Sequence, residues 1–340
     1  MASLKQHVQP ETVKRIFAAY EKARWFPHRP HLGGSQIGHE CDRFLWFQFR
    51  WADHATFEGR MLRLFDHGNV EEGRIVRDLR AIGVTVYDVD PDTGKQWLFK
   101  AHGGHFGLSL DGVGVGFPES TKWHALEFKT HSDKSYRDLE KNGVEKSKPQ
   151  HVAQMQIGMH LAELPRAYYL AVNKNTDAIY GERLRYDKKQ GERLLKRAER
   201  VIFSNEPLER ISERPDWYAC KWCCMYQVCH QGGTAEVNCR TCVHSTPEPD
   251  GTWSCARHDK TLTVKEQRAG CDQHLMRPDL TGHGEAVDAG YDWIEYANDR
   301  GTFRNGVGGY SSHEMRAAKV LPLERPLAHA REVFDGEVVG

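Results

Sequence analysis

The sequence predicts an α/β protein in which a mixed β-sheet is flanked by helices and followed by a small cysteine-rich, metal-bound module. Three observations support this fold class. Several segments repeat apolar residues with helical spacing, and others alternate apolar and polar residues as strands do. Eight of the nine cysteines follow residue 216, where turn residues replace the helical pattern. At roughly 150 residues per domain, 340 residues correspond to about two domains.

The composition is that of a folded protein. Charged residues make up 28% of the chain, and the 47 Lys and Arg residues balance the 47 Asp and Glu residues. A net charge of zero excludes a histone-like polycation, so any nucleic-acid surface must be a local patch. The sequence contains no run of about 18 apolar residues, and its first residues lack the apolar core of a signal peptide. We therefore expect a cytoplasmic protein without a membrane span.

Helices and strands follow one another in the first two thirds of the chain. Segments 83–88, 106–115 and 123–130 alternate as neighbouring antiparallel strands do, and segment 166–172 has the composition of a buried strand. The polar segment 131–150 is expected to form a loop or a loose helix. The predicted helices are residues 10–26, a short aromatic helix that opens near Cys41, and residues 61–82, 151–163 and 187–203.

One group of charged residues predicts an active site. Asp111 is followed, after fifteen intervening residues, by the triplet Glu127-Phe128-Lys129. Side chains two residues apart on a strand share a face, so Glu127 and Lys129 project together. With Asp111 nearby, two carboxylates and one ammonium converge, and hard oxygen ligands of this kind suit Mg²⁺ or Mn²⁺. The lysine would position or help to deprotonate an attacking water. The alternative is an ordinary ion pair on a solvated strand edge.

Two further elements fit a metal site of this kind. Glu72 lies one helical turn after Gly68, and its carboxylate is a candidate third metal ligand, although Glu71 is an equal candidate by sequence. Gln154 and Gln156 lie in the predicted helix 151–163, where a glutamine amide can contact a metal-bound water or a phosphate. The alternative for each is a polar residue on a solvated helix surface.

The order of these parts resembles the RecB-like branch of the PD-(D/E)XK nuclease superfamily, over roughly residues 35–230. The resemblance implies a restriction-endonuclease-like core in which the carboxylates bind Mg²⁺ or Mn²⁺, the lysine assists the water and the glutamine contacts metal-bound water or substrate. Glu72 stands where a histidine is usual, and Gly158 stands where a tyrosine is usual. The matching positions are Gly68 to Glu72, Asp111, Glu127 to Lys129, and Gln154.

The first set of cysteines brackets this core. Cys41 lies far upstream of Cys220, Cys223 and Cys229, which have the spacing C-x₂-C-x₅-C. The arrangement resembles the iron–sulfur staple of AddB-type nucleases and of the CRISPR adaptation nuclease. Four thiolates can hold a [4Fe–4S] cluster, and a Cys₄ zinc site is the alternative. Cys224 is left over as a buried free thiol.

The second set of cysteines predicts a structural zinc site. Its members are Cys239, Cys242, Cys255 and Cys271, which begin with a C-x₂-C knuckle. Histidines 244, 258 and 274 are possible replacements for one of the thiols. The alternative is two unrelated pairs of buried thiols. Metal binding would supply folding free energy to a segment too small to bury much core.

Residues 183–200 contain eight Lys and Arg and three Asp and Glu, which gives a local charge of +5. This basic segment is expected either to contact DNA phosphates or to form an ordinary solvated helix face. The aromatic helix near Cys41 combines cations with aromatic rings. Such side chains can stack on and pair with single-stranded DNA, or they can pack in the protein interior, and the sequence favours neither. They are Arg43, Trp46, Arg50 and Trp51.

These observations together predict a metal-dependent DNA exonuclease. By resemblance, it would act in phage or prokaryotic recombination or repair, with a strand-annealing or other recombination protein as a candidate partner. A non-catalytic DNA-binding scaffold and an iron–sulfur redox or sensor protein are the alternatives. The expected organisation is a helical region (1–60), the nuclease core (61–215), the cysteine cluster of the staple (216–235), the zinc-like module (236–280) and an irregular tail (281–340).

Overall fold

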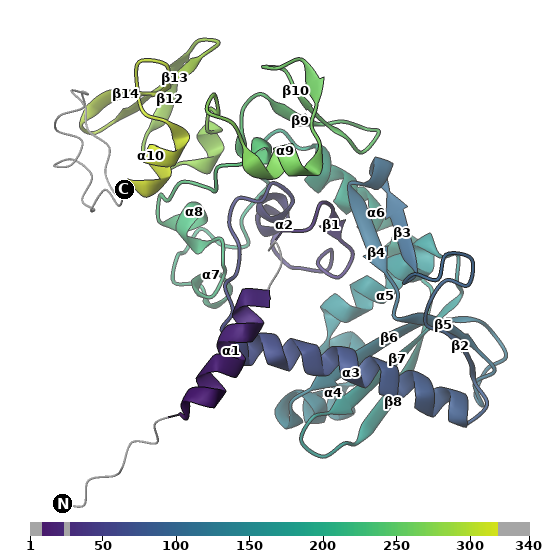
Figure 1. Ribbon diagram of the computed structural model, residues 1–340. Helices are drawn as coiled ribbons and strands as arrows, with labels where there is room; N and C mark the ends of the chain where they lie inside the picture. Colours follow the sequence, from purple (N-terminus) through teal and green to yellow (C-terminus); the bar gives the residue numbers. More distant parts are fainter. Residues whose placement is uncertain (1–8, 24–27, 319–340) are drawn as a thin grey trace, which may run out of the picture. The chain divides into compact units, whose positions relative to one another are not determined.

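A computed structural model describes residues 9–23 and 28–318, which form two compact units (Figure 1). Within the described chain, the first unit comprises residues 9–23, 55–99 and 108–194, and the second comprises residues 28–54, 100–107 and 195–318. The chain passes between the units several times. This division differs from the five consecutive segments predicted, because residues 195–215 belong with the second unit and residues 55–60 with the first.

A five-stranded mixed sheet forms the centre of the first unit, with the strand order β2-β5-β6-β7-β8. Strands β6 and β7 pair in parallel, and the other neighbours pair antiparallel. The predicted α/β class with a mixed sheet is confirmed, whereas the last of these strands was not predicted. The strands are β2 (Thr85–Tyr87), β5 (Gly112–Val115), β6 (His124–His131), β7 (Arg166–Asn173) and β8 (Ile179–Arg185).

Helix α3 (Gly59–Ala81) packs along one face of this sheet (Figure 1). Its residues Ile75 and Leu79 share a buried apolar cluster with Leu126 and Phe128 of β6. Because strand side chains alternate, this packing leaves Glu127 and its same-face neighbours on the other side of the strand. Helix α1 (Glu11–Ala23) packs against α3 and contains no buried residue.

Two consecutive helices follow β6. Helix α4 (Asp133–Ser147) is interrupted at Gly143, where φ is 72°, and α5 (Pro149–Leu161) begins at a proline. The prediction of a loop or loose helix over 131–150 therefore needs correction, because most of this segment is helical. Tyr136, Leu139 and Val144 are buried and hold the helix against the unit.

The predicted single strand over 106–115 is two strands. Strand β4 (Phe106–Ser109) pairs in parallel with β1 (Leu32–Gly33), in a sheet completed by β3 (Leu98–Ala101). After Leu110 and Asp111 the chain continues as β5 in the five-stranded sheet. Asp111 therefore lies at the point where the chain changes sheets, and not inside a strand.

The second unit contains the aromatic helix and the cysteine-rich segment. Helix α2 (Asp42–Phe49) begins after Cys41, whose sulfur accepts a hydrogen bond of 3.4 Å from Phe44 N. Helix α6 (Lys188–Phe203) confirms the predicted helix over 187–203. Its residues from Leu195 onward belong to this unit, and Ala198, Val201 and Ile202 are buried. The shorter elements are α7 (Tyr218–Lys221), α8 (Tyr226–His230), β9 (Ser245–Pro247), β10 (Trp253–Cys255), β11 (Lys260–Thr261) and α9 (Val264–Ala269).

The prediction of an irregular tail after residue 281 is wrong for the described residues up to 318. They form an antiparallel sheet of β12 (Glu285–Ala289), β13 (Trp293–Asn298) and β14 (Gly301–Gly306), followed by α10 (Ser312–Ala317). Ile294 and Tyr296 alternate with polar neighbours and are buried in a small core. Residues 319–340 lie outside the described residues.

Within residues 9–23 and 28–318, no helix combines the length and the apolar composition needed to cross a bilayer.

Candidate active site

The structure brings Asp111, Glu127 and Lys129 together in the first unit. Oδ2 of Asp111 accepts a hydrogen bond of 2.7 Å from the backbone nitrogen of Phe128. The Lys129 ammonium forms an ion pair with Glu127 Oε1 and donates a hydrogen bond of 3.1 Å to Phe128 O. Glu127 is only 1% exposed. The predicted convergence of two carboxylates and one lysine is therefore present in the fold.

Glu72 of α3 approaches the same group. Burial raises its pKa, the negative charge of Asp111 raises it further, and Lys129 lowers it. Glu71 is buried, and its side chain lies 3.6 Å from Arg74, one turn along the helix. The structure thus places Glu72 with the other charged groups and gives Glu71 a structural ion pair.

The charges of these side chains do not balance. Burial raises the pKa of Glu127 to about 7, Lys129 opposes this rise, and Asp111 adds to it. Burial also raises the pKa of Asp111. Burial lowers the pKa of Lys129, but the surrounding carboxylates outweigh that effect, so the net pKa is raised and the ammonium stays charged. Three carboxylates around one ammonium carry excess negative charge, and their oxygens are the ligands that Mg²⁺ and Mn²⁺ prefer. The donor chemistry therefore suits a divalent ion, whereas the ligand atoms of the three carboxylates do not all lie within 4.8 Å of one another in the described part of the chain.

A cavity of about 320 Å³ opens between α3 and the middle of β6. Gly68, Glu72, Phe128, Lys129 and Lys174 are among the residues that line it. No atom outside the helix backbone lies within 4 Å of the position where a Cβ of Gly68 would be. The glycine therefore faces open space and not a close protein neighbour.

The structure does not join Gln154 to this group. Gln154 is largely buried in α5, and within the described chain no hydrogen bond connects it with the three carboxylates. Gln156 has a structural role, because it donates to Arg185 O at 2.9 Å and accepts from Asp187 N at 2.9 Å. The predicted role of Gln154 at the metal site remains a prediction.

Sequence reasoning missed a buried chain of polar side chains beside the site. His131 Nε2 lies 2.8 Å from the hydroxyl of Tyr169, and His151 Nδ1 lies 2.9 Å from the same hydroxyl. Residues 127, 129 and 131 share one face of β6, and Tyr169 is the register partner of Glu127 on β7. The period of two could have identified His131. Burial lowers the pKa of His131 to about 4 and that of His151 to about 3, with further lowering by nearby lysines.

The first cysteine set is brought together in the second unit. Burial raises the pKa of Cys220 and of Cys229, and the thiols of Cys41 and Cys223 raise both further. Cys41 and Cys223 thus lie near enough to Cys220 and to Cys229 to act on their charges. The remaining thiol, Cys224, accepts a hydrogen bond of 3.6 Å from Gln48 Nε2. Four clustered thiols fit a metal or an iron–sulfur cluster.

The second cysteine set lines one cavity of about 380 Å³. Burial raises the pKa of Cys239 to about 12, and the other three thiols of the set contribute to the rise. His274 also lines this cavity, but its ring nitrogens lie 2.8 Å from Ser312 Oγ and 3.0 Å from Asn238 O. The four cysteines thus line one cavity together with His244 and His258, and His274 is engaged elsewhere. The cysteines are Cys239, Cys242, Cys255 and Cys271.

The expected basic surface is partly used in structural contacts. Arg197 and Arg200 both pair with Asp42. Trp46 of the aromatic helix and the following Arg50 and Trp51 are buried, so these three side chains pack in the protein interior and do not form a DNA-binding surface. Arg43 donates a hydrogen bond of 2.7 Å to Leu208 O.

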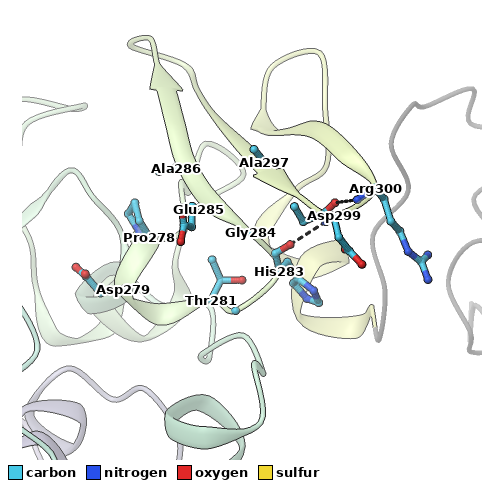
Figure 2. Close-up of a pocket in the computed structure, with 12 residues that line it drawn as sticks. Pro278, Asp279, Thr281, His283, Gly284, Glu285, Ala286, Ala297, Asp299 and Arg300 are labelled. Atoms are coloured by element: carbon cyan, nitrogen blue, oxygen red, sulfur yellow. Dashed lines mark hydrogen bonds between the residues drawn. The ribbon is translucent and has the colours of Figure 1, made fainter.

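A hollow of about 1010 Å³ lies in the second unit between residues 278–286 and 297–300 (Figure 2). Asn298 donates to His283 O at 2.9 Å and accepts from Arg300 N at 2.9 Å. The Asn298 side chain thus stabilises the local backbone. The residues that line the hollow do not form a second group of carboxylates around a lysine.

No protein-family model and no curated protein matches the chain. Among solved structures, the chain is similar to SSO0001, with 12% identity and a TM-score of 0.40, over 65% of this chain and 97% of that chain. It is also similar to the alkaline exonuclease LHK-Exo from Laribacter hongkongensis, with 16% identity and a TM-score of 0.34, over 55% of this chain and 89% of that chain. For LHK-Exo in complex with dAMP the TM-score is 0.35, at the same identity and coverage.

Proposed function

We propose that this protein is a divalent-metal-dependent DNA nuclease. The observation that carries the proposal is the meeting of Asp111, Glu127 and Glu72 around the charged ammonium of Lys129, beside an open cavity. An ordinary surface ion pair would not combine two further carboxylates with nearly complete burial of Glu127. Buried like charges of this kind are costly without a cation, so they favour a metal-binding role.

Each side chain has a separate role in this proposal. Asp111 and Glu127 would hold Mg²⁺ or Mn²⁺, and Glu72 would add a third carboxylate. Such an ion, when bound, acidifies a water molecule and offsets negative charge on a phosphodiester. Lys129 remains protonated because the carboxylates surround it, so it orients the attacking water and offsets charge on the phosphate. Lys174 in the cavity wall offers a second cation for the DNA backbone.

The resemblance to iron–sulfur-stapled nucleases extends the proposal. We infer an exonuclease that acts on DNA ends or single strands in recombination or repair, with a [4Fe–4S] cluster on Cys41, Cys220, Cys223 and Cys229 or zinc as the alternative. The second cysteine set would bind structural Zn²⁺. The proximity of Cys41 and Cys223 to Cys220 supports the first assignment, and the single cavity that the four cysteines of the second set line supports the second.

The test is a nuclease assay of the full chain, purified anaerobically, on single- and double-stranded DNA labelled at either end. Activity should require Mg²⁺ or Mn²⁺, and Asp111→Asn and Lys129→Met should each lower it on the order of 100-fold or more. Asp92→Asn and Lys95→Met are matched controls, because both residues are exposed and neither lines the cavity beside the carboxylate group. Wild-type DNA binding without metal-dependent cleavage would instead support the non-catalytic scaffold. Cleavage that survives either site variant would refute the proposed site.

A further inference from the structure

Two histidines and a glutamate of the second unit direct their ligand atoms at one point. His28 Nε2 lies 3.0 Å from Glu236 Oε2, and His54 Nδ1 contacts the other carboxylate oxygen of Glu236. One ligand atom from each residue lies within 4.8 Å of the others. Among the residues that the structure describes, no other group of three His, Cys, Asp or Glu residues meets this criterion. The group is not part of the carboxylate–lysine site, which belongs to the first unit.

Three separate segments are held in place to bring these atoms together. Glu236 N donates to Ala52 O at 2.8 Å, and its carbonyl accepts 2.6 Å from the hydroxyl of Thr241. The His28 ring stacks on the indole of Trp51, with centroids 5.7 Å apart and planes 20° apart. The backbone contacts of Glu236 and the ring packing of His28 therefore fix two of the ligands before any ion binds, which lowers the cost of binding.

The rings of His28 and His54 meet edge to face and present their nitrogens to different oxygens of Glu236. The rings of His28 and His54 are nearly perpendicular, at 83°, so their nitrogens approach Glu236 from different directions. His28 is 5% exposed, whereas the side chains of His54 and Glu236 are 33% and 22% exposed. One side of the group is thus buried and the other is open to water. Zinc sites with two histidines, one glutamate and one water have this donor set and this open position.

We propose that His28, His54 and Glu236 bind a divalent transition-metal ion of the Zn²⁺ class, with water in the fourth position. The ion would link residues 28–54 to the segment that follows α8. It would be chemically distinct from the ions proposed above, because its ligands are nitrogen and oxygen without sulfur and because histidine is a poor ligand for Mg²⁺.

The experiment uses Co²⁺ as a spectroscopic probe of the full chain after chelator treatment under anaerobic conditions. Co²⁺ bound by cysteines gives intense sulfur-to-metal charge-transfer absorption, and Co²⁺ bound by nitrogen and oxygen does not. The wild-type chain should bind one more equivalent of Co²⁺ than His54→Gln or Glu236→Gln. The difference spectrum should contain visible d–d bands without the sulfur bands. His313→Gln is the matched control, because His313 is an exposed histidine of the same unit.

A second readout separates loss of the ion from loss of the fold. Zn²⁺ added to the wild-type chain should protect His54 from modification by diethylpyrocarbonate, and this measurement needs no variant. Equal Co²⁺ stoichiometry in wild type, His54→Gln and Glu236→Gln would overturn the proposal. Unchanged modification of His54 in saturating Zn²⁺ would overturn it too, even if both variants failed to fold.

Discussion

The carboxylate of Asp111 accepts a 2.7 Å hydrogen bond from the backbone nitrogen of Phe128, the residue between Glu127 and Lys129. This contact holds Asp111, which lies between β4 and β5, against β6, the central strand of the five-stranded sheet. The hydrogen bond needs only an oxygen acceptor, whereas binding a cation needs the negative charge. Substitutions at position 111 can therefore separate structure from chemistry.

Asp111→Asn should keep the fold and lose the metal. The amide oxygen can still accept from Phe128 N, and loss of one buried charge relieves repulsion with Glu127. Asp111→Leu leaves the Phe128 N–H without its partner and should cost about 1–3 kcal/mol of unfolding free energy. Urea unfolding without metal measures the difference. Equal destabilisation by both substitutions would contradict this reading of the hydrogen bond.

Glu72→Gln and Glu71→Gln should have different effects although the residues are adjacent. Glu72 senses the charges of Asp111 and Lys129, so its neutralisation should weaken Mn²⁺ binding roughly 10- to 100-fold. Glu71 pairs with Arg74, so its neutralisation should change stability slightly and leave Mn²⁺ affinity unchanged. Isothermal titration calorimetry, with Mn²⁺ added to the metal-free variants, compares the two affinities. The assignment fails if Glu71→Gln has the larger effect on affinity.

Cys229→Ser should release the group bound by the first cysteine set, and Cys224→Ser should not. Cys229 lies within electrostatic range of Cys41 and Cys223, whereas the sulfur of Cys224 accepts a hydrogen bond from Gln48. Iron and zinc contents of the anaerobically purified variants give the answer, and the element lost from Cys229→Ser identifies the group. The same loss in both variants would show that the set is incorrectly assigned.

His151 should make the protein less stable in acid. Burial lowers its pKa to about 3, and Lys129 adds to the effect. The unfolded value is about 6.5, so between these pH values the unfolded chain binds a proton that the folded chain does not. The free energy of unfolding therefore falls as pH decreases from about 6.5 toward 3, on the order of 5 kcal/mol in total from this group. His151→Gln should flatten this dependence in urea unfolding measured across the window. An unaltered slope would exclude His151 as its source.

Two glycines of α3 should respond oppositely to alanine. A Cβ at Gly59 would lie 2.1 Å from Phe17 O of α1, so Gly59→Ala should displace that helix and cost about 1–3 kcal/mol. Gly73 is exposed and has no such neighbour within 4 Å, so Gly73→Ala should stabilise α3 by about 1 kcal/mol. Thermal unfolding measures both. A neutral Gly59→Ala would show that α1 does not pack tightly at this position.

Local patterns were sufficient for much of the fold and for the centre of the site. The period of two along β6 placed Glu127 and Lys129 on one face, and helical spacing located α3 and α6. The sequence did not predict the small C-terminal sheet, because all of β12 is exposed and β13 and β14 bury only two residues each, so the apolar alternation is weak.

The sequence by itself determined which residue types could bind cations, because carboxylates, imidazoles and thiols are visible without coordinates. Only the tertiary structure decided which of them meet. It placed Glu72 within the influence of Asp111 and Lys129, paired Glu71 with Arg74, and set Asp111 where the chain changes sheets. It also joined His28 and His54 to Glu236, more than 180 positions later. Contacts over such distances follow from how the chain packs, and no local periodicity encodes them.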